Sequence, residues 1–285
     1  MHSKIVVISW WSNCLALACL HRLVELVDAR QIYVVQVGKP IQQRELFRIN
    51  LPTRVTELGY PPGGPAEHSR VLEWVSLHAL RSEAGLWFID HDVIIEADIA
   101  TDHNVSGLGC LETWLQAADQ FLGREKLSLF LPSLNANPAI TQPAFWLSPA
   151  RWPDFTPAFD PIPFEARLES CRPDVYRHDG NLRMPVKDTL IAAREALMQR
   201  GLVGFFPLNP LDGQASNLQP FPPHIHLGGL SLFSGPVLPP QFTEWMERTV
   251  KGFNEFYEHC PAEWLAIEDP VLLERLAEFS KALHV

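Results

Sequence analysis

Leu86-Trp87-Phe88-Ile89-Asp90-His91-Asp92 is a run of four apolar residues that ends at two carboxylates one residue apart. A short apolar run is typical of a buried strand, and residues two apart on a strand lie on the same side. Two carboxylates on one side at the rim of a sheet repel each other unless a positive charge lies between them. A divalent cation with oxygen ligands would supply that charge, whereas a simple turn cap is the structural alternative. The rest of the chain has to distinguish these two interpretations.

The composition is that of a soluble globular enzyme. The chain has 285 residues, 47% hydrophobic and 20% charged, which allows one large α/β domain or two small ones and excludes wholesale disorder. Its formal net charge of −10 argues against a nucleic-acid partner, because nucleic-acid binding needs a basic face. An anionic substrate would therefore need local positive charge or a metal ion.

The cysteines and the N-terminal residues predict a cytoplasmic location. The five cysteines include no C-x-x-C pair, which fits a reducing compartment better than disulfides or a zinc site. The apolar run Ile5–Ile8 is too short for a signal peptide or a transmembrane segment.

Strand and helix signals alternate through the first half of the chain. Ile5–Ile8 reads as a buried strand, a helix over 15–27 can be capped by Ser12 or Asn13, and Ile32–Val37 reads as the next strand. This is a βαβ unit, so the sequence predicts an α/β fold. The alternation continues with a strand over 53–58, a helix over 68–83, a strand over 86–89, a helix over 110–122 and a strand over 127–131.

The second half has a different texture. Prolines and aromatic residues crowd residues 132–173, which favours irregular loops packed on the sheet. A helix is expected over 186–200, with Gly201 as its stop. Residues 240–285 read as two or three amphipathic helices whose polar faces are acidic, which is unsuited to a membrane surface. We expect them to pack on their own domain or to form a homodimer.

Four features, in chain order, carry a family resemblance. They are the opening βαβ unit, the strand ending in Asp90-His91-Asp92, Asp188 at the start of a helix that ends at Gly201, and the string His224-Ile225-His226-Leu227-Gly228-Gly229-Leu230-Ser231. In this order the chain resembles the nucleotide-diphospho-sugar transferases, which are glycosyltransferases of the A-type fold. More loosely, it resembles the family-two inverting glycosyltransferases. The resemblance covers residues 1–235.

The resemblance implies a fold and a division of the chain. The fold would be Rossmann-like α/β, with a mixed, mostly parallel central sheet flanked by helices and a helical C-terminal extension. Residues 1–235 would form the transferase domain, with 1–102 as its nucleotide-binding half and 103–235 as its acceptor half. Residues 236–285 would form the extension.

The resemblance also implies a metal site for Mn²⁺ or Mg²⁺. Asp92 would bind the metal directly, and Asp90 would contact the ribose or a metal-bound water. A late histidine, His226 or His224, would complete the metal shell, and His226 is favoured because it directly precedes the Leu-Gly-Gly turn. His91 is expected to point to the opposite side. The metal would neutralise the leaving diphosphate as the sugar is transferred.

Asp188 is the candidate general base for the acceptor hydroxyl in an inverting transfer. The family often has Glu-Asp here, whereas this chain has Lys187-Asp188. The structural alternative is an acidic residue that only stabilises the first turn of a helix. Trp146 and Trp152 lie where the family binds its acceptor, and they could stack on a sugar ring or belong to the core.

Donor contacts follow from the same resemblance. Ser9 and Trp10 follow the first strand, where the family places the nucleotide base. Gln36 lies where the second strand usually carries an acidic residue, which leaves the choice between a UDP-linked and a GDP-linked donor open. Arg70 and Arg81 are candidate phosphate or base contacts, although surface arginines on a helix are often merely solvated.

Two other functions remain alternatives. A haloacid-dehalogenase-type phosphatase also has an apolar strand before D-x-D, but it needs a later acidic pair after a strand, and Glu268-Asp269 lies in the helical tail. A catalytically degenerate transferase fold could instead serve as a sugar-binding or scaffold protein, which the departures at Gln36 and Lys187 would fit.

Overall fold

The computed structural model describes residues 2–64, 68–95, 110–132, 144–151, 177–178, 181–182, 197, 199–205, 222, 224–227 and 243–283. The chain divides into two compact units. The first unit comprises Met1–Val6, Pro65–Ile89 and Leu111–Pro222, and the second comprises Val7–Gly64, Asp90–Cys110 and Pro223–Val285.

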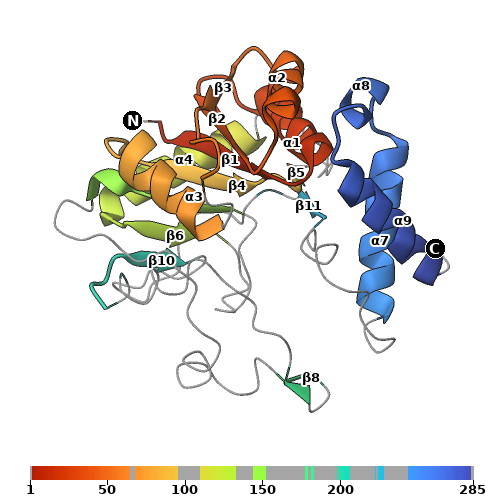
Figure 1. The fold of residues 1–285 in the computed structure, drawn as a ribbon. Helices are drawn as coiled ribbons and strands as arrows, with labels where there is room; N and C mark the ends of the chain where they lie inside the picture. Colours follow the sequence, from red (N-terminus) through yellow and green to blue (C-terminus); the bar gives the residue numbers. More distant parts are fainter. Residues whose placement is uncertain are drawn as a thin grey trace. The chain divides into compact units, whose positions relative to one another are not determined.

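The main sheet confirms the predicted α/β fold with a mostly parallel sheet and C-terminal helices (Figure 1). Its seven strands, in order across the sheet, are β10 (Val203–Phe205), β6 (Leu129–Leu131), β7 (Ala144–Leu147), β4 (Leu86–Asp90), β1 (Lys4–Trp10), β2 (Ile32–Val37) and β3 (Val55–Leu58). β7 is the mixed element, because it pairs antiparallel with both β4 and β6.

The predicted βαβ unit is present at the start of the chain. Helix α1 (Asn13–Leu26) is capped by Ser12, whose side chain accepts a hydrogen bond from the Leu15 amide at 3.1 Å. The helix is buried along most of its length, which explains why its sequence is apolar on nearly every side. Strand β3 pairs parallel with β2 and begins at Val55, two residues later than predicted.

Helix α2 (Ile41–Asn50) is an element that the sequence pattern did not indicate. Phe47 is its only buried residue, so the helix shows no apolar stripe from which a 3.6-residue period could be recognised. It begins directly after its N-cap residue, Pro40, and Gly38 before it has a positive φ of 69°.

A small second sheet joins two segments that are far apart in the sequence. Strand β5 (Val93–Ile95) pairs antiparallel with β11 (His224–His226), so that His226 lies opposite Val93 and His224 lies opposite Ile95. The Leu227 amide extends this pairing by donating to the carbonyl of Asp92 at 3.0 Å.

The tail forms three helices, in agreement with the prediction of two or three. They are α7 (Thr243–Glu258), α8 (Ala262–Leu265) and α9 (Pro270–Leu283). Their apolar faces share a core cluster with Cys14 and Leu15 of α1, to which α7 contributes Phe253 and α9 contributes Leu272 and Phe279. The tail therefore packs on its own unit, and a homodimer stays a prediction. None of the described helices combines the length and the apolar character that crossing a membrane requires.

The helix expected over 68–83 is shorter than predicted. It consists of α3 (His68–Trp74) followed by a π-helical turn, η1 (Val75–Ala79), and the Leu80 amide closes that turn on the Val75 carbonyl at 2.8 Å. The wider turn ends the regular helix, and residues 80–85 form turns before β4. Helix α4 runs over Cys110–Glu125, three residues beyond its predicted end. The helix expected over 186–200 lies almost entirely outside the described residues.

The described remainder consists of short elements. They are the 3₁₀ turn η3 (Pro149–Arg151) and the paired strands β8 (Arg177–His178) and β9 (Asn181–Leu182).

Gly85 holds a tightly packed corner before β4, which yields a stability prediction. A Cβ at this position would lie 2.4 Å from Ser3 Oγ and 2.6 Å from Trp146 Nε1, two atoms that hydrogen-bond each other at 2.9 Å. We expect Gly85→Ala to lower the free energy of unfolding by about 1–3 kcal/mol, measured by chemical denaturation. The control is Gly123→Ala on helix α4, where no atom of the described residues lies within 4 Å of the new Cβ, and it should be neutral or stabilising. Equal effects of the two substitutions would contradict the packing argument.

Candidate functional site

The two carboxylates of the opening motif lie at a corner of the second unit. Strand β4 ends at Asp90, His91 and Asp92 form the turn, and β5 begins at Val93. Asp92 is only 7% exposed, whereas Asp90 is half-buried. His91 is also buried, at 8% exposure. A largely buried carboxylate in a turn between two strands needs polar or charged partners, which makes Asp92 the more constrained of the pair.

The thiol of Cys19, on α1, is close enough to Asp90 and Asp92 for both of their charges to affect its pKa. The thiol donates to the Asp90 carbonyl at 3.7 Å. Burial raises the pKa of Cys19, and the negative charges of Asp92 and then Asp90 raise it further. The Cys19 thiol therefore stays protonated at neutral pH when no metal ion is bound.

Strand β11 brings the late histidines to this corner by backbone pairing. Because His226 is paired with Val93, its backbone lies next to Asp92. His224 lies two residues further along and is half-buried. The side chain of His226 is outside the described part of the structure, so its predicted role as a ligand stays a prediction.

The two carboxylates at the corner suit a metal ion whose coordination shell is completed by a bound substrate. Among the described residues, no group of three or more His, Cys, Asp or Glu side chains is arranged to hold a metal ion. Mg²⁺ sites that bind phosphorylated substrates commonly use only one or two carboxylates, and substrate phosphates and water supply the remaining oxygens. Asp90 and Asp92 match that smaller donor set.

The end of β1 carries the predicted donor contacts Ser9 and Trp10. Ser9 is fully buried, and its hydroxyl makes no hydrogen bond within the described residues. Trp10 is half-buried and meets Trp11 edge-on, with ring centroids 5.6 Å apart. Trp11 has a φ of 62°, a left-handed conformation that is strained for a bulky side chain. Such strain concentrates at binding and catalytic sites.

The N-terminus of α1 is occupied by a side chain that sequence reasoning did not assign to it. Glu268 is 5% exposed and accepts hydrogen bonds from the amides of Asn13 and Cys14, both at 3.0 Å. The hydroxyls of Ser12 and Tyr257 also donate to it, at 2.7 Å and 3.0 Å. This carboxylate takes the position in which many nucleotide-binding folds hold a phosphate. It also gives Glu268 a structural task, which counts against the phosphatase alternative.

A cavity of about 300 Å³ lies at the carboxyl ends of β2 and β3. Gln36 of β2 lines this cavity and is fully buried. Its role as a contact to the nucleotide donor stays a prediction. Lys39 and Arg44 also line the cavity, and the loop Tyr60–Gly64 forms its other wall. Sequence reasoning missed these two cations because α2 was not recognised. The dipeptide Gly38-Lys39 directly after a strand was the available signal.

Predicted site residues in the first unit have structural partners of their own. Arg70 is exposed and pairs with Glu73 at 2.9 Å, and Arg81 is exposed. Trp146 is 3% exposed, and its indole donates to Ser3, so little of its ring is available to a sugar. We therefore leave Trp146 out of the proposed site. Asp188 and Trp152 lie outside the described residues.

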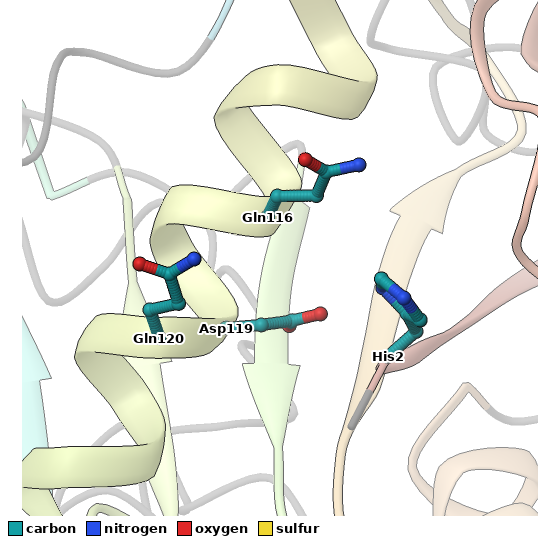
Figure 2. Close-up of a pocket in the computed structure, with 4 residues that line it drawn as sticks. All are labelled: His2, Gln116, Asp119 and Gln120. Atoms are coloured by element: carbon teal, nitrogen blue, oxygen red, sulfur yellow. The ribbon is translucent and has the colours of Figure 1, made fainter.

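A second cavity, of about 260 Å³, is lined by His2, Gln116, Asp119 and Gln120. Figure 2 shows Asp119 directed from α4 toward His2. Both oxygens of Asp119 accept hydrogen bonds, from the Ser3 amide at 3.0 Å and from the Trp87 indole at 3.4 Å. Asp119 therefore ties α4 to the sheet, and we assign this cavity no role in the site.

Several solved structures are similar to this one, and their descriptions are those of glycosyltransferases. The galactosyltransferase LgtC has a TM-score of 0.43 at 12% identity, covering 93% of this chain and 99% of that chain. A mannosyltransferase from Pyrobaculum calidifontis has 0.41 at 12%, covering 99% and 75%, and the glycosyltransferase GlyE of Streptococcus pneumoniae has 0.40 at 10%, covering 99% and 64%. No protein-family model and no curated protein matches the sequence. Similarity at this level assigns neither a reaction nor a substrate.

Proposed function

We propose that this chain is a glycosyltransferase that moves a sugar from a UDP- or GDP-linked donor to an acceptor hydroxyl with the aid of Mn²⁺ or Mg²⁺. The observation that carries the proposal is the buried corner of Asp90 and Asp92 at the carboxyl end of β4. It combines a small metal-binding donor set with the position at which α/β sheets bind ligands.

The strand order supports this position. From β1 the chain builds β2 and β3 on one side and then places β4 on the other, so the order reverses beside β1. The Lys4 amide donates to the Gly85 carbonyl at 3.0 Å, which aligns the starts of β1 and β4. Their carboxyl ends, with Ser9 and Trp10 on β1 and the two carboxylates after β4, therefore flank the switch point at which α/β sheets bind ligands.

In this proposal the residues divide the work of the transfer. A divalent cation, when bound, would neutralise the charge that builds on the leaving diphosphate. Asp92 and Asp90 would hold that cation together with the donor phosphates, and His226 or His224 would complete the shell. Trp10 and Ser9 would contact the nucleotide. Asp188 would take the proton of the acceptor hydroxyl, which predicts inversion at the anomeric carbon.

Nucleotide binding provides the direct test of the donor class. We expect UDP or GDP to bind the full chain with Mn²⁺ present, and the affinity to fall by at least about tenfold when EDTA removes the metal, because Asp90 and Asp92 repel the diphosphate unless a cation lies between them. Isothermal titration calorimetry with each nucleotide measures this. If neither nucleotide binds in the presence of metal, the transferase proposal fails. Binding without turnover of any nucleotide sugar would favour the sugar-binding or scaffold alternative.

The remaining expectations stay part of the proposal. The division into a transferase domain over 1–235 and an extension over 236–285 is one of them, as are the cytoplasmic location and a homodimer formed through the C-terminal helices. Size-exclusion chromatography with light scattering would test the homodimer.

A further inference from the structure

The cavity at the ends of β2 and β3 has the character of an anion site. We call Gln36, Lys39 and Arg44 the basic pocket. No aspartate or glutamate is among the described residues that line this cavity, although the chain as a whole has a net charge of −10. The positively charged side chains of Lys39 and Arg44 thus line one cavity of an acidic protein, and this requires an explanation.

Three donor atoms of the basic pocket are buried without a hydrogen-bond partner among the described residues. Within the described residues, Gln36 Nε2, Lys39 Nζ and Arg44 Nε are each shielded from solvent and make no hydrogen bond. Burying an ammonium, a guanidinium nitrogen or an amide without a partner costs free energy, so such groups are typical of sites that a ligand completes. All three belong to residues that line the same cavity.

Two hydrogen bonds hold the Arg44 side chain of the basic pocket in place. Arg44 Nη2 donates to the carbonyls of Gln36 at 3.2 Å and of Tyr60 at 3.1 Å, which fixes the guanidinium between the ends of β2 and β3. The opposite wall is closed by Gly64, where a Cβ would lie 2.9 Å from the Tyr60 ring. The guanidinium of Arg44 is therefore held in place before a ligand arrives.

The N-terminus of helix α2 lies at the same cavity. Its N-cap residue Pro40, which has no backbone N–H, and its first residue Ile41 line the pocket, the N-cap makes no side-chain hydrogen bond, and the first turn carries no acidic residue. The N-terminus of a helix favours negative charge.

Two negative charges, those of Glu268 and Asp269, act on Lys39, but Glu268 already has hydrogen-bond partners of its own. Burial lowers the pKa of Lys39, and the charges of Glu268 and Asp269 oppose that effect. The oxygens of Glu268 already accept hydrogen bonds from Ser12, Asn13, Cys14, Tyr257 and the Asp269 amide. Glu268 is therefore committed to the α1 N-terminus and does not supply Lys39 with a hydrogen-bonded partner.

We propose that the basic pocket binds a phosphate group through Lys39, Arg44 and Gln36. Phosphate suits this set better than a carboxylate, because donors from three different residues line one cavity and phosphate presents three or more acceptor oxygens. The inference does not rest on the proposed transferase activity. The phosphate group can be free, part of a sugar phosphate or part of a nucleotide, since all three present the same chemistry to the pocket.

The test is a binding titration of the full chain in EDTA, so that a metal at Asp90 and Asp92 contributes nothing. Inorganic phosphate, glucose 1-phosphate and UMP are the three probes, followed by calorimetry. We expect saturable binding of at least one probe, weakened by at least about tenfold in Lys39→Gln. The tightest probe identifies the source of the phosphate group. Absence of saturable binding for all three probes would overturn the proposal.

Matched variants separate the pocket from net charge and from folding. Lys251→Gln removes an exposed lysine of α7 and should bind like the unaltered chain. Arg44→Gln should weaken binding, whereas Arg48→Gln on the same helix, whose guanidinium pairs with Glu57, should not. Because Lys39 is a buried cation with a lowered pKa, its replacement by a neutral side chain should leave the melting temperature unchanged or higher. Equal binding by Lys39→Gln and Lys251→Gln would refute the assignment.

Discussion

Asp92→Asn is expected to reduce nucleotide-sugar turnover by a factor of about 100 to 1,000, the largest catalytic effect in this chain. The substitution keeps the shape of the side chain and removes one of two negative charges at the β4–β5 corner. Asp92 is 7% exposed, so solvent does little to compensate for the loss of its negative charge. A charge developing on the leaving diphosphate would then be poorly neutralised. Initial rates over a panel of UDP- and GDP-linked sugars, at several Mn²⁺ concentrations, measure the effect.

Asp28→Asn is the matched control for this prediction. The Asp28 side chain is 98% exposed and lies 4.0 Å from Arg54, so the same chemical change should leave turnover within about twofold. An Asp92→Asn protein that retains full activity and an unchanged Mn²⁺ requirement would remove Asp92 from the proposed metal grip. Asp188→Asn tests the general base separately, because it should slow transfer while nucleotide binding with metal persists.

Glu268→Ala is expected to lower the free energy of unfolding by about 3–5 kcal/mol, the largest stability effect in the second unit. The carboxylate is 5% exposed and joins the N-terminus of α1 to the segment between α8 and α9. Burial and then the charge of Glu268 raise the pKa of Tyr257, so that its hydroxyl remains a donor at neutral pH. Truncation leaves these amide and hydroxyl donors buried without an acceptor. Urea denaturation followed by circular dichroism measures the loss.

Two further variants make the stability prediction specific. Glu274→Ala removes an exposed glutamate of α9 and should change the free energy of unfolding by less than about 0.5 kcal/mol. Glu268→Gln keeps an acceptor oxygen and should fall between the two alanine variants. A Glu268→Ala protein as stable as Glu274→Ala would show that the tail is held by its apolar cluster alone.

The βαβ opening and strand β4 could be predicted from local sequence, whereas strand β7 lies where irregular loops were expected. Buried strands such as β2 are short, mostly apolar runs, and the bounds of β2 coincide with the predicted ones because both faces of this strand are largely buried. The cap at Ser12 was likewise readable, since a hydroxyl before an apolar helix has a local physical role. Helix α2 was not readable, because Phe47 is its only buried residue and its other apolar residues, Ile41, Leu46 and Ile49, are exposed.

The sequence by itself determined that Asp90 and Asp92 end a buried strand, since that depends only on neighbouring residues and the period of a strand. It did not determine what surrounds them. The pairing of β11 with β5 joins His226 to Val93, and the bond from Ser12 to Glu268 spans 256 positions. Nor could it show that Lys39 and Arg44 share one cavity with Gln36. These associations are decided by tertiary packing, because they depend on which buried groups can satisfy one another across the whole chain.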